Sequence, residues 1–585
     1  MNKIRNFRWK EHVWELAALF AVFAVLCAFA AQKEGYHMDE LLSFELANAE
    51  FNPWIVPTQP VGRLAKFVQE EIRGESLGET LANLGETVAD VVQNKGASRL
   101  LQYKADVYPE PVWISGKQFR DYLTTGTGDR FNYLSVYFNV KDDNHPPLHF
   151  MLLHTMSSLF AGILHPFLGC ILNILAVLGC MVCLFRLGTL LEGHGIIPEG
   201  CGRYAGICMG LLYGLSAGAA ATALLIRMYG LMTFFCVALF YLHVKKWLEN
   251  GFSEKNGRLL AVTALGFWTQ YFFLFYCITL AAVTVAMLWA KKRFGELKRY
   301  VGTMALAAGV GVFLFPFAIQ DVFSSGRGQE ALRNLGSGFS GYGARLGAFG
   351  VILLEGVFGS VPAAVICLLI LTAAICLLVL RKKSKGQEKG PGGAPGSFWL
   401  MLLVPVAAYF MLAARMSPYL VDRYIMPLFP FVAVALCLPA VMAFGRFCAG
   451  KKACFFLPVM VLGAVSLLSY DGEYLYKGYN RQLEIAGQYQ DLACICLYDG
   501  LGYYYNLPEF MHYEKTMLLT LPELEQRQDK ESLEGQRQII VLKKAGVETE
   551  DALDALQEYG WRVERELLPE ADSVYGDTIY FCVEE

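Results

Sequence analysis

The chain has 585 residues, of which 55% are hydrophobic and only 18% are charged, and its mean hydropathy is +0.37. This composition is more apolar than that of ordinary soluble domains and predicts a polytopic α-helical membrane protein. The formal net charge of −3 provides no global basic field for a nucleic acid. Most of the 16 cysteines lie inside apolar runs, where cysteine acts as a small hydrophobic residue, so no disulfide framework is predicted.

The first apolar run, Val13–Ala31, follows a basic N-terminal segment. The tripeptide Ala28-Phe29-Ala30 resembles a signal-peptidase site, so a cleaved signal peptide and an uncleaved first helix are both open. The run is longer than the usual core of a signal peptide, which favours an uncleaved membrane helix.

An acidic pair, Asp39-Glu40, follows this first helix closely. A carboxylate just outside the membrane can take the proton from an acceptor hydroxyl as that hydroxyl attacks. The alternative is a solvated acidic pair at the start of a helix, where an aspartate also serves as a cap. The dipeptide is too common to decide between these interpretations by itself.

The first polar segment, Gln32–His145, contains a stretch that resembles an amphipathic helix, Gly62–Gln102. The segment ends in Asp142-Asp143-Asn144-His145-Pro146-Pro147. Because two prolines restrict the backbone, His145 is expected to be held rigidly at the membrane surface. A proline-led helix start that is capped by Asp143 or Asn144 is the alternative.

Three histidines of this region, His145, His149 and His154, follow one another at short spacing and are candidate metal ligands. No carboxylate or cysteine completes an obvious set of ligands, so a non-metal role is favoured and no cofactor is predicted. The sequence does not exclude a divalent ion.

Nine further apolar runs follow, and one of them is too long for a single crossing. At about 1.5 Å per residue, Leu259–Ala290 exceeds a hydrocarbon core of about 30 Å and is expected to turn near Gln270–Tyr276. With the first helix this predicts about 11 crossings. The runs are Pro166–Leu187, Tyr204–Leu225, Met228–Val244, Leu259–Ala290, Val301–Ile319, Val361–Leu380, Phe398–Ala414, Ile425–Phe444 and Phe455–Leu468.

The lysine-rich connections predict the orientation. If the apolar run Pro147–Leu164 lies along the interface without crossing, every such connection falls inside with the basic N-terminus, as the positive-inside bias requires. Residues 32–165 then form an exterior loop of a transmembrane module, 1–469. Residues 470–585 alternate strand-like and helical patterns, which predicts a small exterior α/β domain.

The short outer segments of this topology contain arginine and no lysine. The guanidinium fork binds two phosphate oxygens and stays charged in a dry site. Arg227 and Arg423 lie at helix mouths, where a lipid-linked phosphate is expected, although snorkelling toward lipid headgroups is the alternative. The set comprises Arg227, Arg327, Arg333, Arg345, Arg415 and Arg423.

A glycine-rich outer segment, Gln320–Arg345, surrounds three of these arginines. It is expected to be a loop that either closes over a charged headgroup or is merely flexible.

In this order, these motifs resemble those of the membrane-embedded GT-C glycosyltransferases, in the branch related to protein O-mannosyltransferases and bacterial aminoarabinose transferases. The likeness extends to about Phe444. Two departures are Gln270, where relatives often have histidine, and His149, which replaces a usual tyrosine. The motifs are Asp39-Glu40, His145-Pro146-Pro147-Leu148, Leu152-Leu153-His154, Arg227-Met228-Tyr229, Thr269-Gln270-Tyr271-Phe272 and Arg423-Tyr424-Ile425-Met426-Pro427.

The resemblance implies a GT-C fold and an inverting transfer of a sugar from a polyprenyl-phosphate carrier to a lipid, glycan or protein acceptor. It places this reaction at the outer face of a bacterial cytoplasmic membrane, with the N-terminus inside and the C-terminal domain outside. The partners are then the carrier, the acceptor and the surrounding lipids.

The resemblance also implies roles for particular residues. Asp39 matches the general base of the family, and Glu40 is its catalytic neighbour. The residues expected to bind the donor phosphate are Arg227, Arg423, Tyr229 and Tyr424. The residues expected to orient the acceptor or the site are Asp143 and His145.

A transporter or lipid flippase for a phosphate-containing substrate is the alternative function. Such a protein needs polar or broken helices at the middle of the membrane, whereas the ionisable residues here gather at the outer helix mouths. Glu355 is the nearest exception.

Overall fold

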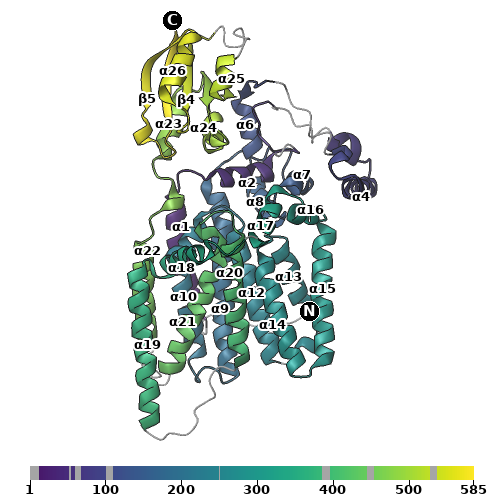
Figure 1. Cartoon of the computed structure of the whole chain (residues 1–585), viewed down its shortest axis with the longest axis vertical. Coiled ribbons are helices and arrows are strands. Elements are labelled where there is room, and N and C mark those ends of the chain that lie inside the picture. Colours follow the sequence, from purple (N-terminus) through teal and green to yellow (C-terminus); the bar gives the residue numbers. More distant parts are fainter. Residues whose placement is uncertain are drawn as a thin grey trace. The chain divides into compact units, whose positions relative to one another are not determined.

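A computed structural model describes residues 12–51, 54–58, 67–100, 110–249, 251–336, 338–384, 396–444, 453–526 and 536–585. It separates into two compact units. Figure 1 shows the chain coloured by residue number. The helical unit comprises Met1–Ala31, Asn144–His149 and Cys170–Glu473. The mixed unit comprises Gln32–Asp143, Phe150–Gly169 and Tyr474–Glu585. The basic residues before His12 and two lysine-bearing connections, 385–395 and 445–452, lie outside the described residues.

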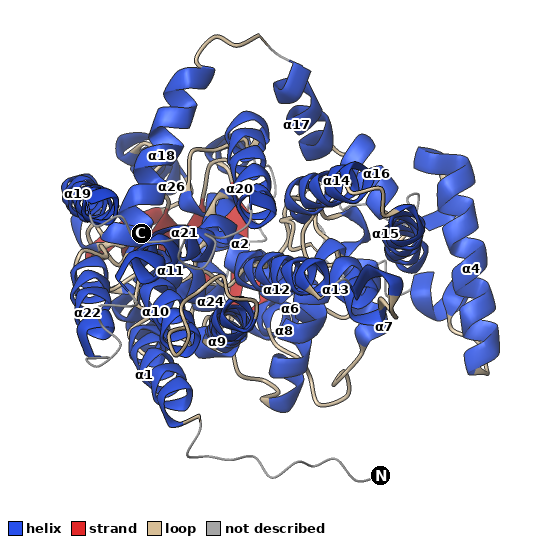
Figure 2. Ribbon diagram, turned by 90° about the horizontal axis from the view of Figure 1, so that it is seen from below, coloured by secondary structure: helices blue, strands red, loops and turns tan. Residues whose placement is uncertain are grey.

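The helical unit is a bundle of apolar helices, which Figure 2 shows nearly end-on. Seven of its described helices are long and apolar enough to cross a membrane. These are α1 (Val13–Ala30), α9 (Pro166–Gly193), α12 (Tyr229–Leu248), α14 (Phe273–Ala290), α15 (Phe294–Leu314), α20 (Gly396–Met416) and α21 (Phe429–Phe444), the last with its preceding turn η7 (Met426–Leu428).

Three bent helix pairs raise the number of spans to at most ten within the described residues. The pair α10 (Gly202–Gly214) and α11 (Ala217–Leu224) bends by 62°, and α18 (Tyr342–Phe358) with the start of α19 (Val361–Ser384) bends by 73°. The third involves α22 (Ala453–Leu468). Ser216 causes the first break, because its Oγ accepts the Ala219 N–H at 3.1 Å and so caps α11.

The long run Leu259–Ala290 forms the predicted hairpin. Its first arm is α13 (Gly257–Phe267), and its second arm is α14. At about 1.5 Å per residue, α13 is shorter than a full span. Together with the other spans, α13 accounts for the apolar runs of the sequence, and the predicted polytopic α-helical architecture is confirmed.

The glycine-rich segment Gln320–Arg345 was expected to be a loop, but most of it is helical. It contains α16 (Ala318–Phe323), α17 (Gly326–Gly336) and the start of α18. Ser325 begins α17, because its Oγ accepts the Gly328 N–H at 3.0 Å. A Cβ at Gly328 would lie 2.3 Å from the Val322 carbonyl oxygen, so this glycine allows two helices to meet closely.

The mixed unit contains a six-stranded sheet in the order β1-β3-β2-β4-β6-β5. Strands β2, β3 and β4 are parallel, and the outer pairings are antiparallel. A core of buried residues from the strands and α26 covers one side of the sheet. Figure 1 shows α26 beside β4 and β5. The strands are β1 (Ile114–Ser115), β2 (Ala493–Leu497), β3 (Lys515–Leu519), β4 (Gln538–Lys543), β5 (Trp561–Leu568) and β6 (Thr578–Glu584).

The first loop supplies one strand of this sheet and several helices of the same unit. Strand β1 pairs with β3 through Ile114 and Thr516. The sequence-based division assigned residues 32–165 to the transmembrane module, whereas the structure groups 32–143 with the C-terminal residues. A two-residue strand such as β1 leaves no period-2 pattern in a sequence, so its pairing could not be predicted.

Apart from α4, which has 18 residues, the helices of the mixed unit are short. The division of the chain into units falls within helix α8 (Leu148–Leu159), which spans about 18 Å at 1.5 Å per residue, too little to cross a bilayer. The others are α2 (Met38–Asn48), α4 (Leu77–Asn94), α6 (Gly116–Leu123), α7 (Tyr133–Asn139), α23 (Tyr479–Gln488), α24 (Leu507–Phe510), α25 (Leu521–Gln526) and α26 (Thr549–Glu558).

Candidate functional site

Arg227 lies in the break between α11 and α12, and its side chain is buried. Its backbone N–H donates to the Leu225 carbonyl at 2.7 Å. The end of α11 leaves backbone carbonyls without helical partners, and side chains of α9 bind them. Asn173 Nδ2 donates to the Leu225 carbonyl oxygen at 2.5 Å, and the Cys170 thiol donates to the Leu224 carbonyl oxygen at 3.6 Å. The interruption therefore fixes one guanidinium group among packed helices.

Two histidines lie close to Arg227. Arg227 Nη2 is 3.5 Å from His145 Nδ1. Burial lowers the pKa of His149 to about 3, and the positive charge of Arg227 acts in the same direction. His149 is therefore neutral at physiological pH. The surroundings of Arg227 are thus electropositive and largely dry, which suits a bound anion.

Arg423 belongs to a second interruption, the short turn η6 (Asp422–Tyr424). Its guanidinium lies 5.5 Å from the centre of the Tyr424 ring. Tyr424 is held in place because Tyr409 Oη donates to its carbonyl at 2.9 Å and because its ring packs 5.5 Å from that of Phe272. Phe272 comes from the turn between α13 and α14.

The two arginine motifs meet through their tyrosines. The rings of Tyr229 and Tyr424 make an edge-to-face contact with centres 6.1 Å apart. Gly230 allows α12 to approach α9 here, because a Cβ on it would lie 2.6 Å from Asn173 Oδ1. All four residues predicted to bind the donor phosphate therefore belong to one region of the helical unit.

Glu473 is a titratable residue of this unit that the sequence did not reveal. Glu473 is exposed at the surface, but partial desolvation raises its pKa to about 7, the negative charges of Asp422 and Asp471 add to this shift, and Arg423 opposes it. The group therefore changes its charge near neutral pH within the electrostatic influence of Arg423. No motif surrounds it, so only its spatial neighbours identify it.

Other arginines of the predicted outer set have structural partners. Arg345 donates to the Ala414 and Ser417 carbonyls, which closes the C-terminal end of α20. Arg415 donates to the Gly338 carbonyl at 2.9 Å. Arg327 forms an ion pair with Glu330 at 2.9 Å.

In the mixed unit, Asp39 lies in the first turn of α2. The cap of this helix is His37, whose Nδ1 accepts the Asp39 N–H at 3.0 Å, so Asp39 does not serve as the cap. Asp39 Oδ2 lies 3.6 Å from the same ring nitrogen, and the side chain remains 25% exposed. This carboxylate therefore retains access to the surroundings of the unit.

Glu40 has a different environment from its neighbour. Its Oε2 accepts the His37 N–H at 2.7 Å and pairs with Lys33 Nζ at 3.0 Å, and both charged side chains are fully buried. Lys33 also donates to the Tyr474 carbonyl at 2.7 Å. Glu40 is thus committed to holding the start of α2.

The remaining predicted positions are also buried. Asp143 ends the turn η4 (Val140–Asp142) in the mixed unit, and its N–H donates to the Val140 carbonyl at 3.1 Å. Gln270, in the turn between α13 and α14, accepts the Phe272 N–H with its Oε1 at 3.2 Å. Its side chain therefore shapes the turn that carries Phe272.

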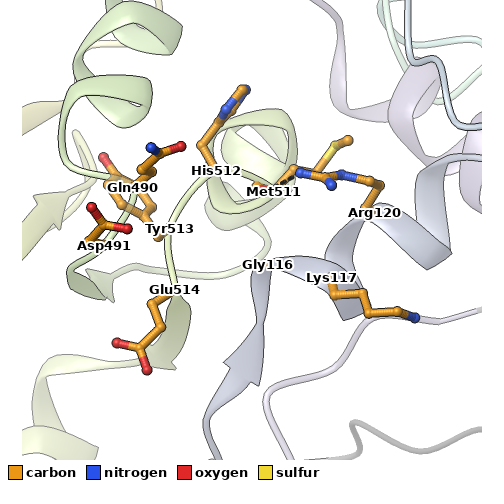
Figure 3. Close-up of a pocket in the computed structure, with 9 residues that line it drawn as sticks. All are labelled: Gly116, Lys117, Arg120, Gln490, Asp491, Met511, His512, Tyr513 and Glu514. Carbon is orange, nitrogen blue, oxygen red and sulfur yellow. Dashed lines mark hydrogen bonds between the residues drawn. The ribbon is translucent and has the colours of Figure 1, made fainter.

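A pocket of about 400 Å³ opens elsewhere in the mixed unit, where α6 meets the loop before β3 (Figure 3). Its lining carries charges of both signs and includes none of the predicted site residues. The lining residues are Gly116, Lys117, Arg120, Gln490, Asp491, Met511, His512, Tyr513 and Glu514. Separately, among the described residues, no group of three or more His, Cys, Asp and Glu side chains could hold a metal ion.

Comparisons with known proteins identify two similar solved structures. No protein-family model and no curated protein matches the sequence. The solved structures are crystal structures of ArnT from Cupriavidus metallidurans, one bound to undecaprenyl phosphate and one in the apo state. The bound structure is 12% identical to this chain and the apo structure is 10% identical, and each has a TM-score of 0.44. Each match covers 75% of this chain, together with 88% of the bound ArnT chain and 87% of the apo chain.

Proposed function

We propose that this protein is a membrane glycosyltransferase that moves a sugar from a polyprenyl-phosphate carrier to an acceptor, with inversion, at the outer face of the membrane. The observation that supports it best is the electropositive region around buried Arg227 and His145, joined to Arg423 by the contact between Tyr229 and Tyr424. Undecaprenyl phosphate, which one ArnT crystal structure contains, belongs to the proposed class of carrier.

Arg227 and Arg423 act on the leaving group in this mechanism. When the bond between the anomeric carbon and the phosphate oxygen breaks, the electron pair goes to that oxygen. Two guanidinium groups stabilise this charge as it develops, and a buried one is worth more because water does not screen it. His145 orients Arg227, which it contacts.

Asp39 acts on the acceptor. As the acceptor oxygen bonds to the anomeric carbon, the Asp39 carboxylate takes its proton, so the sugar is transferred with inversion and the carrier leaves as a phosphate. The partial exposure of Asp39 is compatible with access to an acceptor hydroxyl. Glu40 holds the helix turn that carries the base, and Asp143 has a supporting role.

The test is turnover of a panel of polyprenyl-phosphate sugars by the purified protein in the presence of a panel of lipid, glycan and protein acceptors, with released carrier phosphate measured by mass spectrometry. We expect Asp39→Asn to lower turnover by about 10²–10⁴-fold, as loss of a general base does. Asp121→Asn is the matched control, because it removes an exposed carboxylate paired with Lys117 in the same unit. Donor binding without any turnover by the wild-type protein would overturn the proposal in favour of a transporter.

The proposed location is tested by labelling in intact cells with a membrane-impermeant maleimide. A cysteine at Gln329, exposed on α17, should react from outside. A cysteine at Lys255, exposed in the connection before α13, should be protected. The reverse pattern would place the candidate site on the cytoplasmic side.

A further inference from the structure

The sheet of the mixed unit has a position that commonly binds ligands. Its parallel strands have the order β3-β2-β4, so the chain leaves β2 toward one side and later returns to the other side of it. In open α/β sheets, ligands bind beyond the carboxyl ends of the strands at this topological switch point. Here the position lies beyond the ends of β2 and β4, after Leu497 and Lys543.

A buried charged network occupies this position. Lys544, which directly follows β4, pairs with Asp577 at 2.5 Å and donates to Asn506 Oδ1 at 2.7 Å. Asn506 Nδ2 in turn donates to Glu509 at 2.7 Å and to Asp577 at 2.8 Å. Burial raises the pKa of Glu509 to about 8, so this carboxyl group is protonated at neutral pH. Asp577 is then the anionic partner of Lys544.

Aromatic rings extend the network toward the first loop. Lys544 Nζ lies 5.6 Å from the ring centres of both Tyr505 and Tyr575, and these two rings are 4.8 Å apart. The Tyr575 ring also packs against Tyr479 at 5.2 Å. Such contacts restrict the Tyr575 side chain and direct its hydroxyl group.

The group bound by Tyr575 is the backbone of the first loop. Tyr575 Oη accepts the Tyr36 N–H at 3.0 Å and donates to the Tyr36 carbonyl at 2.7 Å. A Cβ at Gly35 would lie 2.7 Å from Tyr575 Oη, 2.8 Å from Tyr476 Cβ and 3.1 Å from Tyr479 Cβ. This close fit requires glycine, and it shows that the C-terminal residues form a cradle for the segment that precedes α2.

The cradle is connected to Asp39 over a few residues. His37 follows Tyr36, packs against the Tyr505 ring at 5.8 Å and caps α2 by accepting the Asp39 N–H. On the other side of Gly35, the Glu34 N–H donates to the Leu475 carbonyl at 2.8 Å. The C-terminal residues thus hold the chain both before and after Gly35, immediately ahead of the proposed base.

We propose that the C-terminal α/β domain is a positioning part of the active site, in which the switch-point position binds Gly35–His37 as a built-in ligand and Tyr575 is the positioning residue that orients Asp39. This role rests on the proposed function of Asp39 as the base. The C-terminal domain then contributes to catalysis by positioning the base, and no separate ligand has to bind to it.

The first test compares two tyrosine variants of the full-length protein. Tyr575→Phe removes the hydroxyl group that holds Tyr36. Tyr559→Phe, the matched control, removes a hydroxyl group that donates to the Leu524 carbonyl at 2.5 Å in the same domain. We expect Tyr575→Phe to lower kcat by about 10- to 100-fold with the donor KM unchanged, because small displacements of a catalytic group cost rate more than binding. Tyr559→Phe should change neither constant.

The second test does not depend on activity. Hydrogen–deuterium exchange of the amides at positions 36–42 should be at least several-fold faster in Tyr575→Phe and unchanged in Tyr559→Phe. Unchanged exchange and unchanged kcat in an active Tyr575→Phe protein would overturn the positioning role and leave the proposed function intact. A wild-type protein without transferase activity whose Tyr575→Phe variant still shows faster exchange would overturn the function and leave the cradle intact.

Discussion

Arg227 and Arg423 differ in how tightly their guanidinium groups are held. Arg227 is buried in a helix break, whereas Arg423 lies partly exposed over the Tyr424 ring. A lysine preserves the charge at either position but cannot form the two-pronged contact with phosphate that arginine makes. The two positions therefore separate the effect of charge from the effect of geometry.

We expect Arg227→Lys to weaken binding of polyprenyl phosphate by roughly 10-fold or more, because the loss of one charge-assisted hydrogen bond costs about 1.5–3 kcal/mol. Arg423→Lys should have a smaller effect, because water can replace part of its contact. Titration calorimetry in detergent measures both. Arg327→Lys, which alters a partner of Glu330, should bind like wild type. Equal affinities for all three variants would exclude phosphate recognition by Arg227.

Glu473 predicts a pH dependence of donor binding. Its pKa of about 7 means that the carboxyl group is neutral below this pH and negative above it. The negative charge that Glu473 gains weakens the attraction between Arg423 and the donor phosphodiester. The phosphodiester itself does not titrate in this range. The donor KM should therefore rise as the pH increases from 6 to 8.

The matched variants for this effect are Glu473→Gln and Glu484→Gln, the latter an exposed position on α23. Glu473→Gln should give a low donor KM at both pH values, and Glu484→Gln should retain the wild-type rise. A profile that is the same for Glu473→Gln and wild type would assign the titration to another group.

At the scale of single residues, the sequence shows which residue type lies at a helix mouth, but it does not show which side chains that residue contacts. Arg227 and Arg423 were singled out because arginine without lysine is unusual beside apolar runs, and their role as phosphate ligands stays a prediction. The Lys33 partner of Glu40 was not predicted, because a lone lysine after a membrane helix has no distinguishing pattern. Glu473 was missed for a similar reason, since its shift arises from spatial neighbours.

Helix α2 depends on a buried ion pair at its first turn. Lys33 and Glu40 are 3.0 Å apart and fully buried, so removal of one charge leaves the other without its partner in a dry site. The same carboxylate also accepts the His37 N–H. The start of this helix is therefore more sensitive to charge than to side-chain size.

We expect Lys33→Met to destabilise the mixed unit by about 3–5 kcal/mol, the usual cost of breaking a buried pair. The double variant Lys33→Met/Glu40→Gln should recover a large part of this loss, because no unpaired charge remains. Thermal unfolding of the purified wild type, single variant and double variant measures the order of their stabilities. A double variant less stable than Lys33→Met would show that the pair is not the dominant interaction.

Hydropathy and periodicity predicted the elements unequally well. The apolar runs became helices close to their predicted bounds, because burial of apolar side chains in lipid requires helical backbone. The glycine-rich segment Gln320–Arg345 was misjudged, since Ser325 and close packing at Gly328 stabilise helices that composition disfavours. Strand β1 was invisible, because two residues show no alternation.

At the scale of the whole chain, the C-terminal sheet is completed by the first loop. Strand β1 covers the edge of β3, and Gly116 lies so close to the Tyr513 carbonyl that a Cβ would be 2.3 Å from its oxygen. An uncovered edge strand invites association with other chains. The pairing of such distant segments could not be predicted from local patterns.

We expect residues 470–585 expressed alone to self-associate, because the edge of β3 and the cradle for Gly35 are both uncovered. Co-expression with a fragment of residues 32–143 should shift the product to a discrete complex. Size-exclusion chromatography with light scattering distinguishes the two states. A stable monomer of residues 470–585 would show that the first loop is dispensable for the fold of this domain.

The bond between Tyr36 and Tyr575 joins positions 539 residues apart. At about 5–20 residues per second, a ribosome needs roughly half a minute to two minutes to travel from one to the other. Throughout that interval the nascent polypeptide carries Asp39 without the tyrosine that secures it. Under the proposed positioning role, newly made copies would thus have a reduced kcat until translation has passed Tyr575, and a product that ends before this residue would keep that deficit even with every membrane helix in place.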